Sequence, residues 1–241
     1  MKAIILAAGY ATRLYPLTKD RPKPLLPIRE KPIIDYIVDQ IGTIPAVDRI
    51  FVVTNHKFAG HFEKWAAEGK RALPVTVVDD GTTDNETRLG AIGDIAFTLG
   101  AGKIDDEILI IAGDNYSTYP LREQYDFYAE KGGDCLCAQR IADAEDIKRY
   151  AVAQIDGDGK VLSLVEKPQN PLSDLAVFAT YIYTRDTAAL FQKYLAEGNN
   201  PDAPGHFPQW LYKRKPVYVY IMNGECYDIG TLQSYEEVQA L

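Results

Sequence analysis

Short apolar runs alternate with amphipathic stretches through the first half of the chain. The apolar runs predict strands at residues 3–6, 49–54, 75–79, 107–112 and 134–138. The stretches between them have helical spacing and predict helices at residues 32–41, 58–68, 89–99 and 121–130. Because strands that alternate with helices pair in parallel and are covered on both faces, the pattern predicts an α/β fold with helices on both sides of one sheet.

The pattern changes after residue 150, where the apolar runs follow one another closely. They predict strands at residues 151–155, 161–165 and 177–183, with the turn Asp156-Gly157-Asp158-Gly159 between the first two. Helices at 187–196, 206–212 and 232–241 and a strand at 217–222 complete the pattern. We therefore expect a mixed, mainly parallel sheet in a three-layer α/β/α arrangement, formed by a single domain over residues 1–241.

The composition is that of an ordinary globular protein. Of the 241 residues, 46% are hydrophobic and 25% are charged. No apolar run approaches the ~20 residues that cross a bilayer, and the short run near Met1 lacks the flanks of a signal peptide. The net charge of −8 argues against binding to nucleic acid or to an anionic membrane surface. We expect a cytoplasmic protein, and the sequence leaves its oligomeric state open, with a homo-oligomer compatible.

The first 31 residues depart from this acidic balance. They contain seven basic and two acidic side chains, a net charge of +5. The buried-strand run at 3–6 ends in Ala7-Ala8-Gly9, where small residues let a ligand approach the backbone and N–H groups can hold phosphate oxygens. Arg13 adds a fork of donors that stays charged, and Lys23 is a compact cation stiffened by a proline on each side. This segment therefore predicts a binding site for a polyphosphate.

The cysteines and histidines show neither metal-ligand nor catalytic spacing. The odd set of cysteines is expected to be buried and structural: Cys135, Cys137 and Cys226. Surface or packing roles are expected for the three histidines: His56, His61 and His206. A mechanism with a covalent cysteine or serine nucleophile is therefore not indicated.

The longest motif covers residues 6–28, LAAGYATRLYPLTKDRPKPLLPI. It resembles the signature G-x-G-T-R-L-x-P-L-T-x-x-x-P-K-P-L-L-P of nucleotidyltransferases that make nucleotide sugars, the glucose-1-phosphate thymidylyltransferase and uridylyltransferase group. Ala11 stands where this group usually has glycine. The resemblance implies a Rossmann-like, glycosyltransferase-A-like fold and catalytic roles for Arg13 and Lys23. It implies nucleotide binding by Leu6, Ala7, Ala8, Gly9, Thr12 and Gly90.

Two acidic residues are candidates for holding Mg²⁺. Asp114 follows the predicted strand at 107–112 and therefore lies at the edge of the sheet where ligands bind. The resemblance makes Asp114 one ligand, and it makes Asp228, in a segment similar to W-x-D-I-G-T, the other. Mg²⁺ characteristically takes one or two carboxylates and substrate phosphates. Without the resemblance, an Asp after Gly is more often only a turn or helix-cap residue. Capping of the last helix by Thr231 is compatible with a metal role for Asp228.

The acceptor end of the site is indicated by Glu166-Lys167-Pro168, which matches the E-K-P of the same family. The resemblance implies that Lys167 binds the acceptor phosphate and Glu166 its hydroxyl groups, beside Ala151 and Val177. The family's pattern is broken at three positions, where Ala151 and Ala179 replace glycine and Phe178 replaces threonine. Because these side chains are larger, the acceptor could also be a phosphorylated molecule other than a hexose 1-phosphate.

The base of the nucleotide is left unassigned. Relatives usually place a Gln shortly before the turn that corresponds to Leu89-Gly90, and residues 80–88 contain none. This polar loop is expected to face either the nucleotide or the acceptor.

Three functions are compatible with these residues. The first is Mg²⁺-dependent transfer of a nucleoside monophosphate from a nucleoside triphosphate to a phosphorylated small molecule, foremost a sugar 1-phosphate, with release of pyrophosphate. The second is a cytidylyltransferase acting on a phospho-alcohol or phosphonate such as phosphocholine. The third is a non-catalytic sensor of a nucleotide sugar, which the complete set of charged residues disfavours.

Overall fold

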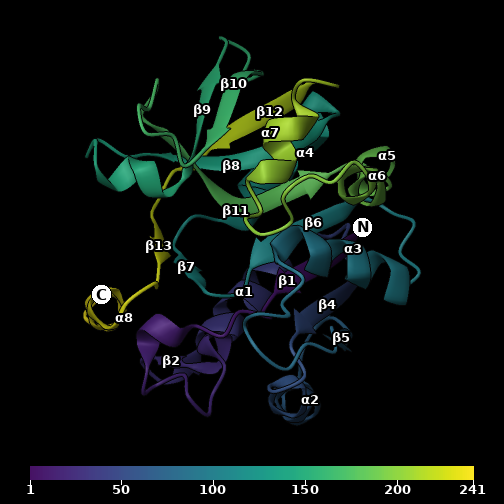
Figure 1. Cartoon of the computed structure of the whole chain (residues 1–241), viewed down its shortest axis with the longest axis vertical. Helices are drawn as coiled ribbons and strands as arrows, with labels where there is room; N and C mark the ends of the chain where they lie inside the picture. The colour runs from purple at the N-terminus through teal and green to yellow at the C-terminus, as the bar shows by residue number, and fades with distance from the viewer.

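The computed structural model describes all residues from 1 to 241, and one nine-stranded sheet runs through it (Figure 1). The strands are β1 (Lys2–Leu6), β4 (Arg49–Thr54), β5 (Val75–Asp79), β6 (Ile108–Ala112), β8 (Asp134–Arg140), β9 (Ala151–Ile155), β10 (Val161–Glu166), β11 (Leu175–Tyr183) and β12 (Val217–Ile221). Their order is β10-β9-β11-β6-β1-β4-β5, and β8 joins β11 to β12. The predicted strands are all present, and their ends differ from the prediction by at most two residues.

The sheet has a parallel half and a largely antiparallel half, which confirms the mixed sheet. In the parallel half, β1 lies between β6 and β4, and β5 follows β4. In the other half, β11 runs antiparallel to β6, β8 and β9. The alternating pattern predicted β8 as one more member of the parallel run. It does run in the same direction as β6, but β11 is inserted between the two strands.

Helices cover both faces of the sheet, as the three-layer prediction requires. On one face lie α1 (Ile33–Ile41), α2 (Ala59–Glu68) and α4 (Leu121–Lys131), packed with Ile5 of β1. On the other lie α3 (Ala91–Ala101), α6 (Leu190–Ala196) and α7 (His206–Leu211), packed with Ile4. The helix predicted over 187–196 is two pieces, since α5 (Arg185–Ala188) ends before α6 begins. None of the helices is long and apolar enough to cross a membrane.

Several short elements escaped prediction because two to four residues carry no periodicity. They are the strand pair β2 (Pro27–Ile28) and β3 (Lys31–Pro32), the pair β7 (Asn115–Ser117) and β13 (Cys226–Asp228), and the 3₁₀ turns Thr12–Leu14, Lys23–Leu25 and Asp146–Arg149. In the β7–β13 pair, Asp228 lies opposite Asn115. The last helix, α8 (Leu232–Gln239), then starts with a capping box between Thr231 and Ser234.

The cysteines occupy the places predicted for structural thiols. All three are buried and unpaired, two of them in β8 and one in β13. Burial raises the pKa of the Cys137 thiol to about 12. A thiol with a raised pKa is a poor nucleophile at neutral pH, which agrees with a structural role.

Ala11 adopts a backbone conformation that normally favours glycine. Its φ of 47° and ψ of 42° are left-handed, and a side chain costs roughly 1–2 kcal/mol there. The carbonyl oxygen of Ala11 accepts hydrogen bonds from the Thr18 hydroxyl at 2.7 Å and from the Leu14 N–H at 3.0 Å. The loop is thus held in a strained conformation by its own hydrogen bonds.

We predict that Ala11→Gly keeps the free energy of unfolding constant or raises it by up to about 1 kcal/mol. Relief of the left-handed strain offsets the greater freedom of glycine in the unfolded chain. Urea unfolding measures the change. The control is Ala129→Gly, at an exposed position of α4, which should lose about 1 kcal/mol. Equal losses in the two variants would contradict the strain at Ala11.

Candidate active site

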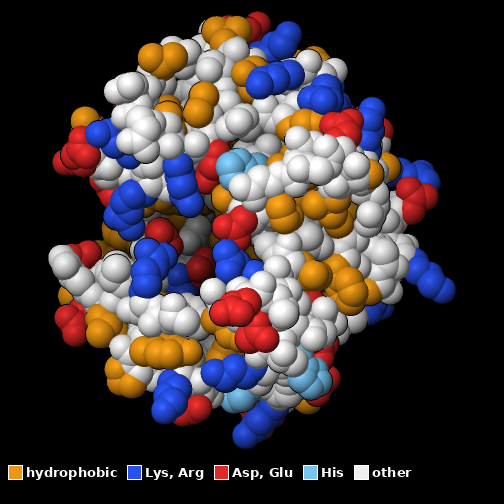
Figure 2. Space-filling view, viewed as in Figure 1, with side chains coloured by type: hydrophobic (Ala, Val, Ile, Leu, Met, Phe, Trp, Pro, Cys, Tyr) orange, Lys and Arg blue, Asp and Glu red, His pale blue; other side chains and the backbone are white.

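A cleft opens at the edge of the sheet where the parallel strands end, and three adjoining cavities within it share Asp114. The turn cavity, about 440 Å³, lies along residues 6–14 beside Lys23. The helix cavity, about 290 Å³, lies at the start of α3. The strand cavity, about 340 Å³, lies between the end of β6 and strands β9 and β11. Figure 2 shows a hollow on the left of the molecule with Lys and Arg side chains at its rim and acidic side chains inside.

The turn after β1 is fixed from behind by two polar side chains. The Thr54 hydroxyl donates to the carbonyl oxygen of Ala7 at 3.2 Å, and the Asn55 amide donates to that of Ala8 at 2.9 Å. Asn55 also accepts from the N–H of Phe58 at 3.1 Å. Thr54 and Asn55 are fully buried. Sequence reasoning missed these two residues, although polar residues that end a buried strand were the available signal.

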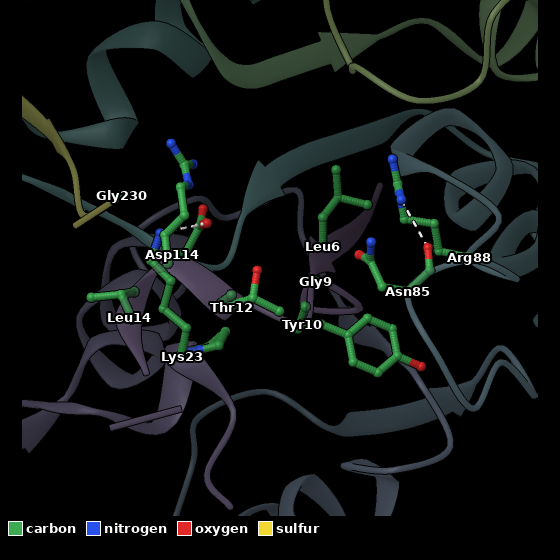
Figure 3. A pocket seen from close by; sticks show the side chains of 14 residues that line it. Leu6, Gly9, Tyr10, Thr12, Leu14, Lys23, Asn85, Arg88, Asp114 and Gly230 are labelled. Carbon is green, nitrogen blue, oxygen red and sulfur yellow. Dashed lines mark hydrogen bonds and ion pairs between the residues drawn. The ribbon is translucent and has the colours of Figure 1, made fainter. Parts of the chain in front are cut away.

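Lys23 is buried between the two candidate metal ligands. Its Nζ lies 2.7 Å from Oδ2 of Asp114 and 3.9 Å from Oδ1 of Asp228, and its side chain is only 7% exposed. A buried ammonium requires such partners, because an unpaired one would be very costly. Figure 3 shows Lys23 and Asp114 on one side of the turn cavity, with Tyr10, Asn85 and Arg88 on the other. The sequence placed Lys23 correctly at the site but did not predict this ion pair.

The two carboxylates are close enough to influence each other. Burial and then the charge of Asp114 raise the pKa of Asp228, and the nearby cations Lys23, Arg149 and Arg13 oppose that rise. Arg149 Nη2 lies 3.9 Å from Oδ2 of Asp228. Arg149 was not predicted, since a basic residue in a 3₁₀ turn carries no distinctive pattern. The result is a pair of acids surrounded by three cations.

The donor set fits Mg²⁺. Asp114 and Asp228 contact the same ammonium group, so their carboxylates converge on one place. The chain has no group of three or more His, Cys, Asp or Glu side chains that could enclose a metal. Two converging carboxylates with open space beside them match an ion that completes its coordination with water and phosphate oxygens.

The strand cavity holds the predicted acceptor residues. Strand β11 pairs with β9 through Leu175–Val177, and after a bulge it pairs with β6 from Thr180 onward. This change of partner leaves the cavity between β6 and β9. Glu166 and Lys167 line it together with Ala151, Val177 and Ala179.

Glu166 is held firmly at this cavity. Its side chain is 8% exposed, and burial raises its pKa. Its backbone N–H donates to Gln209 at 2.6 Å. Gly205 covers the carboxylate so closely that a Cβ there would lie 1.9 Å from Oε2. Lys167 Nζ lies 3.8 Å from Glu166 Oε1 and is mostly exposed, so the cation is free to meet a ligand.

The departures from the family pattern fall at the strand cavity. Ala151 and Ala179 both line this cavity, so their methyl groups take up space that glycine would leave free. Phe178 stands at its border, where its ring packs 4.8 Å from the ring of Tyr150. The phenylalanine therefore extends the hydrophobic core as well as the cavity lining.

The polar loop at residues 80–88 faces the turn cavity. Asn85 and Arg88 line that cavity together with Tyr10 (Figure 3). Arg88 also donates to Asp202 Oδ1 from Nε at 3.2 Å and from Nη2 at 3.1 Å. These cavity-lining residues were missed, because sequence reasoning left the direction of the loop open.

Gly90 has a structural task in addition to lining the helix cavity. Its φ is +79°, and a Cβ there would lie 2.6 Å from the carbonyl oxygen of Pro201. The N–H groups of Ala91 and Ile92 donate to the carbonyls of Asp202 and Pro201 at 3.0 and 2.9 Å. The loop that contains Pro201 and Asp202 thus caps α3.

All predicted site residues reach the cleft. Those in the turn cavity are Leu6, Ala7, Gly9, Thr12, Arg13, Lys23 and Asp114. Those in the helix cavity include Ala8 and Gly90, and those in the strand cavity are Ala151, Glu166, Lys167, Val177 and Asp228. Their roles remain predictions.

A mixed α/β sheet with a glycine turn, a buried lysine and paired acids, all at the edge where such sheets bind ligands, makes this a ligand-cleft protein of the α/β class. The profile of the nucleotidyl transferase family matches residues 2–241. The chain belongs to the nucleotidyl transferase family.

Curated relatives support this membership. A protein of Sulfolobus acidocaldarius, provisionally named a mannose-1-phosphate guanyltransferase, is 29% identical over 99% of this chain and 62% of its own length. The UTP–glucose-1-phosphate uridylyltransferase of Synechocystis is 28% identical over 98% and 61%. The bifunctional protein GlmU of Methanocaldococcus jannaschii is 28% identical over 95% and 51%. The chain thus spans between half and about three-fifths of these relatives.

Solved structures agree on the fold. A Bacillus anthracis protein provisionally named a glucose-1-phosphate thymidylyltransferase has a TM-score of 0.82 at 24% identity, over 100% of this chain and 94% of its own. A UDP-glucose pyrophosphorylase complexed with UDP-glucose has a TM-score of 0.82 at 22% identity, over 99% and 97%. The predicted Rossmann-like, three-layer fold is confirmed.

Gly9 provides a test that separates folding from ligand binding. It lines both the turn and helix cavities, and a Cβ added there would meet no atom within 4 Å. We predict that Gly9→Ala leaves the free energy of unfolding within about 0.5 kcal/mol of the wild-type value. Binding of a nucleoside triphosphate should weaken by about tenfold or more, because the methyl group occupies ligand space. Calorimetric titration and urea unfolding measure the two effects.

The matched control is Gly60→Ala in α2, where an added Cβ also meets nothing. It should raise stability by up to about 1 kcal/mol and leave binding alone, since alanine favours helices. If Gly9→Ala binds triphosphate as well as Gly60→Ala does, no ligand lies against Gly9.

Proposed function

We propose that the protein transfers a nucleoside monophosphate from a nucleoside triphosphate to a sugar 1-phosphate and releases pyrophosphate, with Mg²⁺ as its cofactor. The observation that carries this proposal is the position of Lys23, Asp114 and Asp228. They lie where the turn cavity and the strand cavity meet. A group transferred between two bound ligands has to pass through such a junction.

The turn cavity suits the triphosphate. It presents Arg13, Lys23 and the backbone of residues 6–12 to one open space. Guanidinium and ammonium groups bind phosphate oxygens strongly where water is restricted. Neutralising charge that develops in the transition state is the main contribution that such groups make to phosphoryl chemistry.

The strand cavity suits a phosphorylated sugar. Lys167 offers an exposed cation for the acceptor phosphate, and Glu166 offers a buried carboxylate that accepts hydrogen bonds from hydroxyl groups. The names of the relatives pair a nucleotide with glucose 1-phosphate or mannose 1-phosphate. Nothing in the comparisons favours a phospho-alcohol such as phosphocholine.

Positioning accounts for most of the chemistry. The acceptor phosphate oxygen attacks the α-phosphorus, the bond to the β-phosphate oxygen breaks, and pyrophosphate leaves with that electron pair. Arg13 and Lys23 hold the triphosphate while Lys167 holds the acceptor, so two anions are brought together against their repulsion. Asp114 and Asp228 would hold Mg²⁺, which when bound neutralises charge on phosphate oxygens.

The direct test incubates the protein with Mg²⁺, each nucleoside triphosphate in turn and a panel of acceptors. The panel contains hexose 1-phosphates, polyol phosphates and phosphocholine, and pyrophosphate release is measured. We expect release with at least one hexose 1-phosphate. Release with phosphocholine and CTP alone would favour the cytidylyltransferase. Tight nucleotide binding without Mg²⁺ and without turnover would favour a sensor.

We predict that Asp114→Asn and Asp228→Asn each raise the Mg²⁺ concentration needed for half-maximal transfer by about tenfold or more. Each variant removes one of two carboxylates from a hard cation. The double variant should lose transfer while keeping its fold, and the effects should be non-additive because the two acids act on one ion. Initial rates over a Mg²⁺ series provide the measurement.

Asp106→Asn is the control, since Asp106 pairs with the N-terminal amine at 3.0 Å, away from the cleft residues. Its Mg²⁺ profile should match that of the wild type. An unchanged profile for Asp228→Asn would mean that β13 serves only to attach the end of the chain.

A further inference from the structure

Five buried side-chain polar atoms lack a hydrogen-bond partner, and three of them lie close together beside the cleft. These three are the Tyr10 hydroxyl, Oδ2 of Asp80 and Oδ1 of Asp94. Each of the three residues is only 7% exposed. Buried polar atoms in folded proteins almost always have partners. A cluster of buried polar atoms without partners therefore indicates that a proton, a water molecule or a ligand supplies the missing hydrogen bonds.

The chain brings Asp80 and Asp94 together from two elements. Asp80 follows β5, where its N–H donates to the carbonyl of Thr54 at 2.9 Å. Its Oδ1 accepts from the N–H and the hydroxyl of Thr82, both at 2.7 Å. Asp94 lies in the first turn of α3, and its carboxyl group faces that of Asp80 within hydrogen-bonding reach.

One shared proton satisfies the two unpartnered carboxylate oxygens, Oδ2 of Asp80 and Oδ1 of Asp94, and leaves only the Tyr10 hydroxyl of this cluster without a partner. Two facing carboxylates in a buried place repel each other, and a proton between them removes one charge and supplies the missing hydrogen bond. Burial, and then Asp80, raise the pKa of Asp94 to about 8. Asp94 is therefore the member of the pair that keeps the proton at neutral pH.

The cations near the pair are bound to other carboxylates. Tyr10 approaches Asp80 from the turn after β1, near Thr82. Arg88 lines the helix cavity with Asp94, but its guanidinium group is bound to Asp202. The remaining charged group of that cavity is Asp114, which is paired with Lys23.

The second oxygen of Asp94 is open to the helix cavity, since only Oδ1 is among the buried unpaired atoms and Asp94 lines that cavity. Arg13 and Lys23 line the turn cavity and not the helix cavity. The phosphates therefore belong with these cations. The helix cavity suits an uncharged part of the ligand that donates a hydrogen bond to Asp94.

We propose that Asp80 and Asp94 share one proton and that Asp94 thereby presents an uncharged hydrogen-bond acceptor to an N–H group of the nucleobase. The proposal rests on the proposed function, because it assumes that the cleft binds a nucleoside triphosphate. A neutral acid adds a base contact without placing another negative charge near the phosphates. An ionised Asp94 would repel them.

The experiment measures binding, not turnover, by calorimetric titration of the full chain. Each nucleoside triphosphate is titrated first, and the tightest binder is compared with inorganic tripolyphosphate. At pH 7.5, Asp94→Leu should weaken binding of the nucleotide by about tenfold, the cost of an unpaired polar group. Tripolyphosphate, which has no base, should bind Asp94→Leu and the wild type alike.

The direction in which pH changes the Kd for the nucleotide follows from the loss of the proton on Asp94. Between pH 7.5 and 9.5 the wild-type Asp94 loses its proton, so its Kd for the nucleotide should rise by about tenfold or more. In Asp94→Asn the side chain cannot ionise, so this part of the rise should be absent. Other groups that titrate in this range act on both proteins and cancel in the comparison.

Carbon-13 NMR of the side-chain carboxyl groups provides a readout that needs no ligand. One aspartate signal should titrate near pH 8 in the wild type and be missing in Asp94→Asn. The proposal is overturned if that signal titrates below pH 5, if wild type and Asp94→Asn show the same Kd ratio, or if a folded Asp94→Leu binds nucleotide normally. If no nucleotide binds at all, the proposed function fails, while the NMR titration still decides the shared proton.

Discussion

One buried ammonium group between two carboxylates determines how this protein is organised. Lys23 contacts Asp114 and approaches Asp228, which come from the end of β6 and from β13 near the end of the chain. Removing a single partner from a buried ionic group is costly, because it leaves the others uncompensated. The N-terminal motif, the sheet edge and the C-terminal segment are therefore tied to one point.

The sheet topology explains why that point lies between two cavities. Strands β6, β1 and β4 are parallel, so their carboxyl ends form one edge, where the turn after β1 lies. Strand β11 then changes its partner from β9 to β6 at a bulge, and the strand cavity opens beside this change. The proposed nucleotide and acceptor sites thus fall on the parallel and antiparallel halves of the same sheet.

The sequence predicted the elements that are long enough to show periodicity. Strands β4, β5 and β9 have the predicted ends, whereas β7 and β13 are too short to leave a pattern. The insertion of β11 between β6 and β8 also escaped prediction, since pairing depends on contacts between distant residues.

The site was predictable where it coincides with a motif. Residues 6–28 and Glu166-Lys167-Pro168 indicated the turn cavity and the strand cavity, and the family resemblance brought Asp228 to Asp114. The residues that were missed act through three-dimensional contacts. Asn55 holds the turn through a backbone carbonyl, and Asp94 has a raised pKa because it is buried and faces Asp80. No local sequence pattern distinguishes such an aspartate from a solvated one on a helix.

The most direct test of the central claim is the rate of pyrophosphate release by Lys23 variants, with the best pair of triphosphate and acceptor. If Lys23 pairs with the two carboxylates and also binds the phosphates, Lys23→Ala should fold, and its turnover should fall by about a hundredfold or more. Lys23→Arg should recover only part of that loss, because a planar fork does not replace a compact charge. Near-normal turnover of Lys23→Ala would contradict the account.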